Sequence, residues 1–209
     1  MFDPAAATRR PQPGLGTMQR VFDFAIASAA LLLLAPVLLC IAAAIGCLDR
    51  APALFFQKRI GKDGKAFTMI KFRSLTPDGT PTRMGAVLRR YSLDELPEFW
   101  NVLRGDMALV GPRPMIEADQ PKLPVIRALR QQIRPGITGW AQINGRNALS
   151  FEQTFRLDLW YRRNRSLWLD LYIVLATVPC VLSGRGACAL APTSRPKVAQ
   201  ARKPANATT

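Results

Sequence analysis

The acidic residues of this sequence are concentrated in one segment that could carry chemistry. Of its fourteen Asp and Glu residues, six fall between positions 94 and 119: Asp94, Glu95, Glu98, Asp106, Glu117 and Asp119. A carboxylate can attack phosphorus and form a covalent intermediate, and a neighbouring carboxylate can hold a magnesium ion that neutralises phosphate oxygens. The adjacent pair Asp94 and Glu95 permits that division of labour.

The same pair also has a purely structural interpretation. The run Ser92-Leu93-Asp94-Glu95-Leu96-Pro97 is typical of a helix start, with Pro97 in the first turn and Ser92 and Glu95 as a capping box. Acids at such a position are favoured by the helix dipole alone. This segment by itself therefore leaves both a helix cap and a catalytic pair open.

Basic residues elsewhere in the chain favour the catalytic interpretation. Guanidinium groups donate two parallel hydrogen bonds to phosphate oxygens, which suits them to grip a diphosphate. Four arginines stand in motifs that contain Gly, Pro or Ser rather than on a plain helix face: Arg73, Arg89, Arg113 and Arg146. Any one of them could form an ordinary surface salt bridge, but their recurrence indicates a phosphate-binding site.

The composition narrows the classes of protein further. The chain has 29 Lys and Arg, no His and a formal net charge of +15, which calls for a polyanionic partner: nucleic acid, an anionic membrane surface or a phosphorylated substrate. The absence of His excludes Ser-His and Cys-His nucleophile pairs and restricts a metal site to other ligands. Since the four cysteines form no C-x-x-C pair, a hard cation with oxygen ligands is the metal to expect.

One segment belongs in a membrane. From Phe24 to Leu48 the chain has 25 residues without a charge, and as a helix this run would extend about 37 Å, beyond the roughly 30 Å hydrocarbon core of a bilayer. Pro36 interrupts the helical hydrogen bonds in its middle, and basic residues lie on both flanks. We therefore expect a re-entrant helix that bends at Pro36 and keeps both ends in the cytoplasm. A simple span is the main alternative, and a secretory or lipoprotein signal is a weaker one.

The rest of the chain predicts a small α+β domain, mainly helical with short strands. We expect disordered tails at 1–17 and 186–209, a membrane anchor at 18–50 and a catalytic domain at 51–185. Within that domain the expected strands are 53–56 and 67–72, joined by a Gly-rich turn, and the expected helices are 97–104, 125–134, 150–163 and 167–182. The last is apolar and short, and Trp160, Tyr161 and Trp168 precede or begin it. It is therefore expected at the membrane interface, with an ordinary core helix as the alternative.

Several motifs together resemble a known family. They are Lys71-Phe72-Arg73-Ser74, Leu88-Arg89, Ser92-Leu93-Asp94-Glu95-Leu96-Pro97, Asn101-Val102-Leu103-Arg104-Gly105-Asp106-Met107, Val110-Gly111-Pro112-Arg113-Pro114, Arg134-Pro135-Gly136-Ile137-Thr138-Gly139-Trp140-Ala141-Gln142 and Asn144-Gly145-Arg146-Asn147. In residue types and order, the chain from about 20 to 184 resembles the bacterial sugar transferases of the small monotopic phosphoglycosyl transferase type.

The resemblance implies a reaction and its partners. Such enzymes move a sugar 1-phosphate from a UDP-sugar to a polyprenol phosphate, here expected to be undecaprenyl phosphate, and release UMP at the start of bacterial glycan assembly. The resemblance implies that Asp94 is the nucleophile, that Glu95 is a ligand of Mg²⁺ or Mn²⁺, and that Lys71, Arg89 and Arg113 bind the nucleotide diphosphate. It also implies a monotopic anchor on the cytoplasmic face of the inner membrane, where anionic lipids would attract the basic domain.

Some features depart from the family pattern, and other classes remain open. Ala35 stands before the helix-breaking proline where the family often has Ser, the connection 74–83 is short, and the membrane domain that precedes the catalytic region in larger relatives is absent from this chain. An inactive scaffold of the same fold and a basic nucleic-acid binder are the competing hypotheses. We expect no nucleic-acid partner, because no zinc finger or RNA-binding motif is found.

Overall fold

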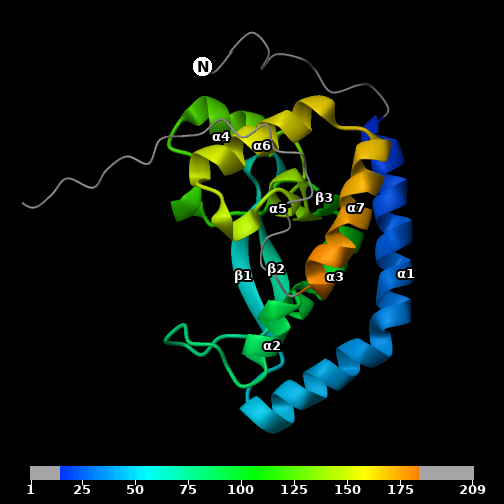
Figure 1. The fold of residues 1–209 in the computed structure, drawn as a ribbon, viewed down its shortest axis with the longest axis vertical. Coiled ribbons are helices and arrows are strands. Elements are labelled where there is room, and N and C mark those ends of the chain that lie inside the picture. Colours follow the sequence, from blue (N-terminus) through cyan, green and yellow to red (C-terminus); the bar gives the residue numbers. More distant parts are fainter. Residues whose placement is uncertain (1–14, 184–209) are drawn as a thin grey trace, which may run out of the picture.

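The computed structural model describes residues 15–183. A long helix, α1 (Leu15–Ala44), runs along one side of a small domain of short helices and two small sheets (Figure 1). This arrangement confirms the predicted α+β class with a predominance of helix. The helix α1 begins three residues before the anchor was expected to start, and the expected tails otherwise lie outside the described residues.

Helix α1 is built as a membrane helix. With the π-helical turn Ile45–Asp49 that follows it, it is long and apolar enough to cross a bilayer, and little of its apolar stretch is buried in the protein. Pro36 lies inside it, and the ribbon changes direction partway along its length (Figure 1). A proline removes one backbone donor and clashes with the preceding turn, which accounts for a bend. The bend is what a re-entrant helix needs, while its orientation in the bilayer stays a prediction.

Polar contacts hold the first arm of α1, the part before Pro36 (residues 15–35), against the domain. The guanidinium of Arg20 donates to the carbonyls of Val102 and Leu103, at 2.5 and 2.6 Å. These carbonyls belong to the last turn of helix α3 (Glu98–Arg104), where carbonyl groups lack the amide partners that they have in the helix interior. One turn further along α1, the Asp23 carboxylate accepts from the Leu109 amide at 3.0 Å. The membrane helix is therefore joined to the domain by directional bonds.

The second arm of α1, the part from Pro36 onward together with the π-helical turn that follows it, packs against the acidic segment. Ile41 and Ile45 form a buried cluster with Phe72 and Leu88, and the partly buried Leu93 and Leu96 pack against this cluster. Leu88 comes from α2 (Gly85–Arg90). The two leucines flank Asp94 and Glu95 in the sequence, so burial of apolar surface holds the acidic pair close to the anchor.

Two antiparallel strands form one wall of the domain. Strands β1 (Leu54–Ile60) and β2 (Ala66–Phe72) pair in a register that sets Lys71 opposite Phe55 and Met69 opposite Gln57. The predicted strands are confirmed, although β1 extends to Ile60 rather than ending at Phe56. Because side chains alternate along a strand, Gln57, Arg59 and Lys71 share one face.

A second, parallel pair lies in the core and was not predicted. Strands β3 (Ala108–Val110) and β4 (Gly136–Thr138) are only three residues each, too short to leave a clear alternation in the sequence. Gly136 permits their close approach, since a Cβ atom there would lie 2.1 Å from the Gly111 nitrogen. The main core surrounds this pair and includes Val102, Ile143 and Ile173.

The remaining helices close the domain. They are α4 (Pro124–Gln131), α5 (Trp140–Ile143), α6 (Phe151–Asn164) and α7 (Leu167–Leu182). Ser150 forms the predicted capping box with Gln153 at the start of α6. Trp168 is 81 % exposed, as an interfacial residue would be, but Tyr161 is buried. The Tyr161 hydroxyl donates to the Asp170 carboxylate at 2.6 Å, so this residue belongs to the core and does not support the interfacial position expected for α7, which stays a prediction.

Candidate active site

All seven side chains singled out in the sequence line one cavity of about 720 Å³. They are Lys71, Arg73, Arg89, Asp94, Glu95, Arg113 and Arg146. Their positions in the chain lie at the end of β2, in α2, in the turn before α3, in the loop after β3 and in the turn after α5. The tertiary structure therefore gathers five separate segments around a single hollow that carries an excess of positive charge.

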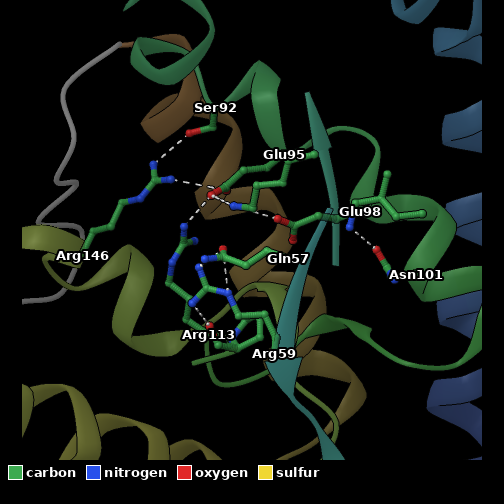
Figure 2. A network of polar contacts seen from close by, with 11 residues as sticks. Gln57, Arg59, Ser92, Glu95, Glu98, Asn101, Arg113 and Arg146 are labelled. Carbon is green, nitrogen blue, oxygen red and sulfur yellow. Dashed lines mark hydrogen bonds and ion pairs between the residues drawn. The ribbon is translucent and has the colours of Figure 1, made fainter. Parts of the chain in front are cut away.

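The acidic pair lies on a single turn of 3₁₀ helix, η4 (Leu93–Glu95), and does not cap a helix. Ser92 has a left-handed backbone conformation and makes no capping hydrogen bond, so the predicted capping box is wrong. The Ser92 hydroxyl instead accepts from Arg146 Nη1 at 2.8 Å (Figure 2). Pro97 immediately precedes α3, close to the predicted first turn. The helix-cap explanation of the acidic pair therefore loses its main support.

Glu95 is surrounded by cations (Figure 2). Its Oε1 atom lies 3.0 Å from Lys71 Nζ and 2.6 Å from Arg113 Nη2, and its Oε2 atom lies 3.3 Å from Arg146 Nη2. Burial alone would raise the pKa of this carboxyl, but the charges of Arg113 and Lys71, helped by Arg146, hold the pKa well below its usual range. Glu95 is therefore ionised at neutral pH and fixes the positions of three cationic side chains.

Asp94 is the opposite case. Its side chain is 7 % exposed and reaches the cavity, yet no other side chain among residues 15–183 donates a hydrogen bond to it or pairs with it. Burial and the charge of Glu95 raise the pKa of Asp94, against the attraction of Lys71 and Arg89. A desolvated carboxylate without partners is more basic and more nucleophilic than a paired one, so Asp94 is the member of the pair suited to attack.

Glu98 is a component of the site that the sequence did not single out. It is 2 % exposed, and its Oε1 atom lies 2.9 Å from Lys71 Nζ. Burial and the neighbouring Glu95 charge raise the pKa of Glu98 to about 7, although Lys71 acts to lower it. The signal was present in the spacing, because residues three apart on a helical segment share a face.

Buried hydrogen bonds position this cluster. Asn101 on α3 is fully buried; its side chain accepts from the Ile70 amide at 3.0 Å and donates to the Thr68 carbonyl at 2.7 Å. These bonds join α3 to β2, the strand that carries Lys71. The Asn101 side chain, labelled beside Glu98 in Figure 2, therefore helps to fix the position of Glu98 relative to the strand that carries Lys71.

Arg113 is held through its backbone. Arg130 of α4 donates to the Arg113 carbonyl, and the Arg130 Nε atom pairs with Asp158 of α6 at 2.7 Å. Both Arg130 and Asp158 are buried, so this ion pair ties two helices to the loop after β3. Proline residues on either side of Arg113 restrict the loop further.

The other predicted arginines lie at the rim. Arg73 donates to the Pro52 carbonyl at 3.0 Å, and its guanidinium lies over the Phe55 ring. Arg89, in α2, lines the cavity. Arg59, which was not singled out, also lines the cavity and donates to Gln57 at 2.6 Å. The alternation of β1 could have identified it, since Arg59 shares a face with Lys71.

The donor set fits a divalent cation only with help from a substrate. No group of three or more acidic, Cys or His side chains forms a metal cage within the described part of the chain. Magnesium, however, is commonly held by one or two carboxylates together with substrate phosphates and water. A carboxylate offers about four lone-pair sites, and the three cations around Glu95 leave one of them. Glu95 therefore fits a cation that arrives with a diphosphate, whose oxygens and water would supply the other ligands.

Comparison with known proteins gives a consistent picture. A family model described as bacterial sugar transferase matches residues 15–184. The uncharacterized sugar transferase EpsL of Bacillus subtilis (strain 168) is 42 % identical over 180 residues, which cover 81 % of this chain and 89 % of that protein. The exopolysaccharide production protein ExoY of Rhizobium meliloti (strain 1021) is 36 % identical over 199 residues, covering 82 % of this chain and 88 % of ExoY.

A third relative carries a defined activity in its name. The UDP-glucose:undecaprenyl-phosphate glucose-1-phosphate transferase of Escherichia coli (strain K12) is 41 % identical over 182 residues. The match covers 77 % of this chain and 39 % of that enzyme. The chain thus spans nearly all of the two shorter relatives but less than half of the longer one.

Proposed function

The chain belongs to the bacterial sugar transferase family, and from this premise we propose that it transfers a sugar 1-phosphate from a UDP-sugar to a polyprenol phosphate. The acceptor is undecaprenyl phosphate, which the name of the related Escherichia coli enzyme specifies. The products are UMP and a polyprenyl diphosphate sugar, the lipid-linked start of an exopolysaccharide, a capsule, an O-antigen or a glycoprotein glycan.

The first step is an attack by Asp94 on the phosphorus atom that bears the sugar. A carboxylate oxygen forms a bond to phosphorus while the bond to the bridging oxygen breaks, and UMP leaves with that electron pair. The cations collected by Glu95, namely Lys71, Arg113 and Arg146, stand where they can neutralise the phosphate oxygens. A phosphosugar is left on Asp94.

In the second step the phosphate oxygen of the lipid attacks the same phosphorus atom. The bond from Asp94 to phosphorus breaks, the carboxylate is regenerated and the polyprenyl diphosphate sugar is released. Glu95 holds its cations through both steps, because its low pKa keeps it ionised. A magnesium ion bound by Glu95 and the diphosphate would supply further neutralisation of charge.

The observation that carries this proposal is the contrast between two neighbours. Glu95 pairs with three cations, whereas Asp94 pairs with none among the described residues, and both face the same basic cavity. A helix cap or a surface charge pair would give neither the burial nor the asymmetry. One carboxylate is arranged to bind cations, and the other is arranged to react.

The architecture fits a reaction between a soluble donor and a membrane lipid. The chain associates with a membrane through α1, and the catalytic turn packs against the second arm of that helix. We place both ends of α1 on the cytoplasmic face of the inner membrane, where UDP-sugars are made and where anionic lipids attract a chain with a net charge of +15.

The decisive experiment mixes the purified protein with a UDP-sugar before any lipid is added. Up to about one UMP per active site should be released, and the protein should gain the mass of a sugar phosphate, since covalent catalysis gives a burst. Asp94→Asn should abolish both signals while it leaves the fold intact. The covalent mechanism fails if UMP is released only after lipid is added, or if Asp94→Asn turns over at the normal rate. A panel of UDP-sugars in this assay would identify the donor.

A further inference from the structure

We propose that a second, apolar cavity beside the active site binds the isoprenoid end of the acceptor lipid. The inference rests on the proposed function and adds to it a binding site for the second substrate. This cavity has a volume of about 190 Å³ and lies between the segment 91–99, the strand β4 and the helix α7.

The walls of this cavity suit a hydrocarbon. Its apolar side chains are Leu93, Leu96, Phe99, Ile137, Ile143 and Val181. Its polar lining includes Gln142, which also lines the polar cavity described below, and two threonines, Thr138 and Thr177, which bond each other through their hydroxyls at 2.6 Å. Because the two hydroxyls satisfy one another, an alkyl chain can cover them without leaving either unpaired.

One end of the cavity meets the reacting groups. Glu95, Arg113 and Arg146 line both this cavity and the larger one that contains Asp94. A ligand that occupied the apolar cavity would therefore place an attached anionic group between two arginines, next to the catalytic turn. A prenyl phosphate has this form: a phosphate monoester at the end of a branched hydrocarbon.

The opposite side of the cavity belongs to a helix that presents apolar residues outward. Val181 of α7 lines the cavity, while Leu175, Val178 and Leu182 of the same helix are more than half exposed. Residues 171–182 of α7 include no charged side chain, so a lipid chain could follow this part of the helix to the cavity. The apolar lining thus continues into a face that is suited to contact the membrane.

The donor nucleotide and its sugar fit a different cavity next to the active site. A third cavity, of about 260 Å³, also shares Arg113 and Arg146, but its lining includes Arg59, Asp119 and Thr154, which the apolar cavity lacks. Hydroxyl groups and a nucleobase need such hydrogen-bonding partners, whereas the apolar cavity would leave them unsatisfied. The three cavities therefore separate a polar donor from an apolar acceptor and converge where phosphate is transferred.

The test fills the apolar cavity from α7. Val181→Phe should raise the apparent KM for undecaprenyl phosphate about tenfold, as expected when a hydrophobic pocket loses the space for part of its ligand. The KM for the UDP-sugar should stay unchanged. The matched control is Val125→Phe, the same substitution at a side chain of α4 that is 60 % exposed and lines none of the three cavities. Both KM values of this variant should equal those of the wild type.

Several outcomes would overturn the inference. It fails if Val181→Phe leaves the lipid KM unchanged, if it raises both KM values equally, or if Val125→Phe has the same effect. Should Val181→Phe not fold, Ile137→Phe fills the cavity from β4 and is judged by the same criteria. A wild-type protein that transfers no sugar phosphate to the lipid would instead refute the proposed function, so the two failures are distinguishable.

Discussion

Ser92 and Arg146, which are 54 positions apart in the chain, are joined by a hydrogen bond of 2.8 Å from Arg146 Nη1 to Ser92 Oγ. Both residues have left-handed backbone conformations, with φ angles of 54° and 48°. Such angles are uncommon for residues other than glycine, and they are found preferentially where the surrounding structure enforces a functional geometry. The bond links the turn that carries Asp94 to the turn that carries Arg146, one of the arginines that we propose to bind phosphate.

Removal of this hydroxyl should loosen the arginine without removing any charge. For Ser92→Ala we expect the KM for the UDP-sugar to rise about fivefold, the equivalent of one hydrogen bond of about 1 kcal/mol. Steady-state kinetics would measure it. As a control, Ser166→Ala removes the cap of α7 and should lower stability by about 1 kcal/mol with no change in KM. An unaltered KM in Ser92→Ala would show that this bond has no role in donor binding.

The raised pKa of Glu98 predicts a specific dependence of stability on pH. Its pKa is about 7 in the folded protein against 4.5 for the ordinary group, so the protonated form contributes stability that is complete below pH 4.5 and is lost as the pH rises through 7. Glu98→Gln stays neutral and avoids this loss. From pH 4.5 to pH 8 its free energy of unfolding should therefore rise relative to the wild type, by up to about 3 kcal/mol.

Denaturant unfolding at a series of pH values would measure the difference. The depressed pKa of Glu95 adds stability above pH 4.5 that is lost as the pH falls, and it keeps Glu95 ionised in both folded proteins over this range, so the difference between the two curves reports the titration of Glu98. The control Glu152→Gln, at a side chain that is 74 % exposed, should run parallel to the wild type. Parallel curves for Glu98→Gln would contradict the prediction.

A third prediction concerns the divalent cation. We expect activity to be lost in chelator and restored by magnesium or manganese, because the carboxylates of this site are hard oxygen ligands. Glu95→Gln keeps the shape of the side chain but removes its charge, so the metal concentration for half-maximal activity should rise about tenfold. A metal titration monitored by UMP release would test it, with Glu98→Gln as a control that keeps the wild-type value. Full activity of the wild type without any divalent ion would refute this role.

Glu95→Gln should also destabilise the protein. The substitution leaves Arg113 and Arg146 without the charge that compensates them, whereas Lys71 keeps its contact with Glu98. Loss of one partner of a buried ion pair typically costs about 3–5 kcal/mol, but Arg113 is 41 % exposed, and solvent screens part of the effect. We therefore expect a loss near 2 kcal/mol, measured by denaturant unfolding at neutral pH. Added UDP-sugar should restore only part of the unfolding free energy that Glu95→Gln loses.

The topology of α1 provides the last prediction. If the helix re-enters the cytoplasmic leaflet, single cysteines that replace Thr17 and Lys62 in a chain without its native cysteines should both resist a membrane-impermeant reagent added outside spheroplasts. Pro36→Leu restores the helical hydrogen bonds and should shift the helix toward a span. If the reagent labels one of the two cysteines in the chain that keeps Pro36, α1 spans the membrane.

Patterns within short stretches of sequence were sufficient for much of this protein. The length and apolarity of α1, the hairpin of β1 and β2 and the capping box at Ser150 depend on residues close to one another in the chain, so periodicity and turn chemistry could reveal them. The motifs that resemble the family also identified seven side chains, and all seven line one cavity. Their roles in the reaction stay predictions.

Other features depend on contacts between distant segments. Tyr161 is buried and donates a hydrogen bond from its hydroxyl to Asp170. Ser92 accepts a hydrogen bond from Arg146 instead of capping a helix. No local pattern specifies such pairs, since each forms only when the whole domain has closed.

The difference in ion pairing between Asp94 and Glu95 also arises only when the domain folds. In the sequence, Asp94 and Glu95 are equivalent neighbours. In the fold, the cations from β2, the loop after β3 and the turn after α5 all converge on Glu95 and leave Asp94 unpaired. Charge interactions depend on distances in space and on burial, and only the tertiary structure sets these quantities.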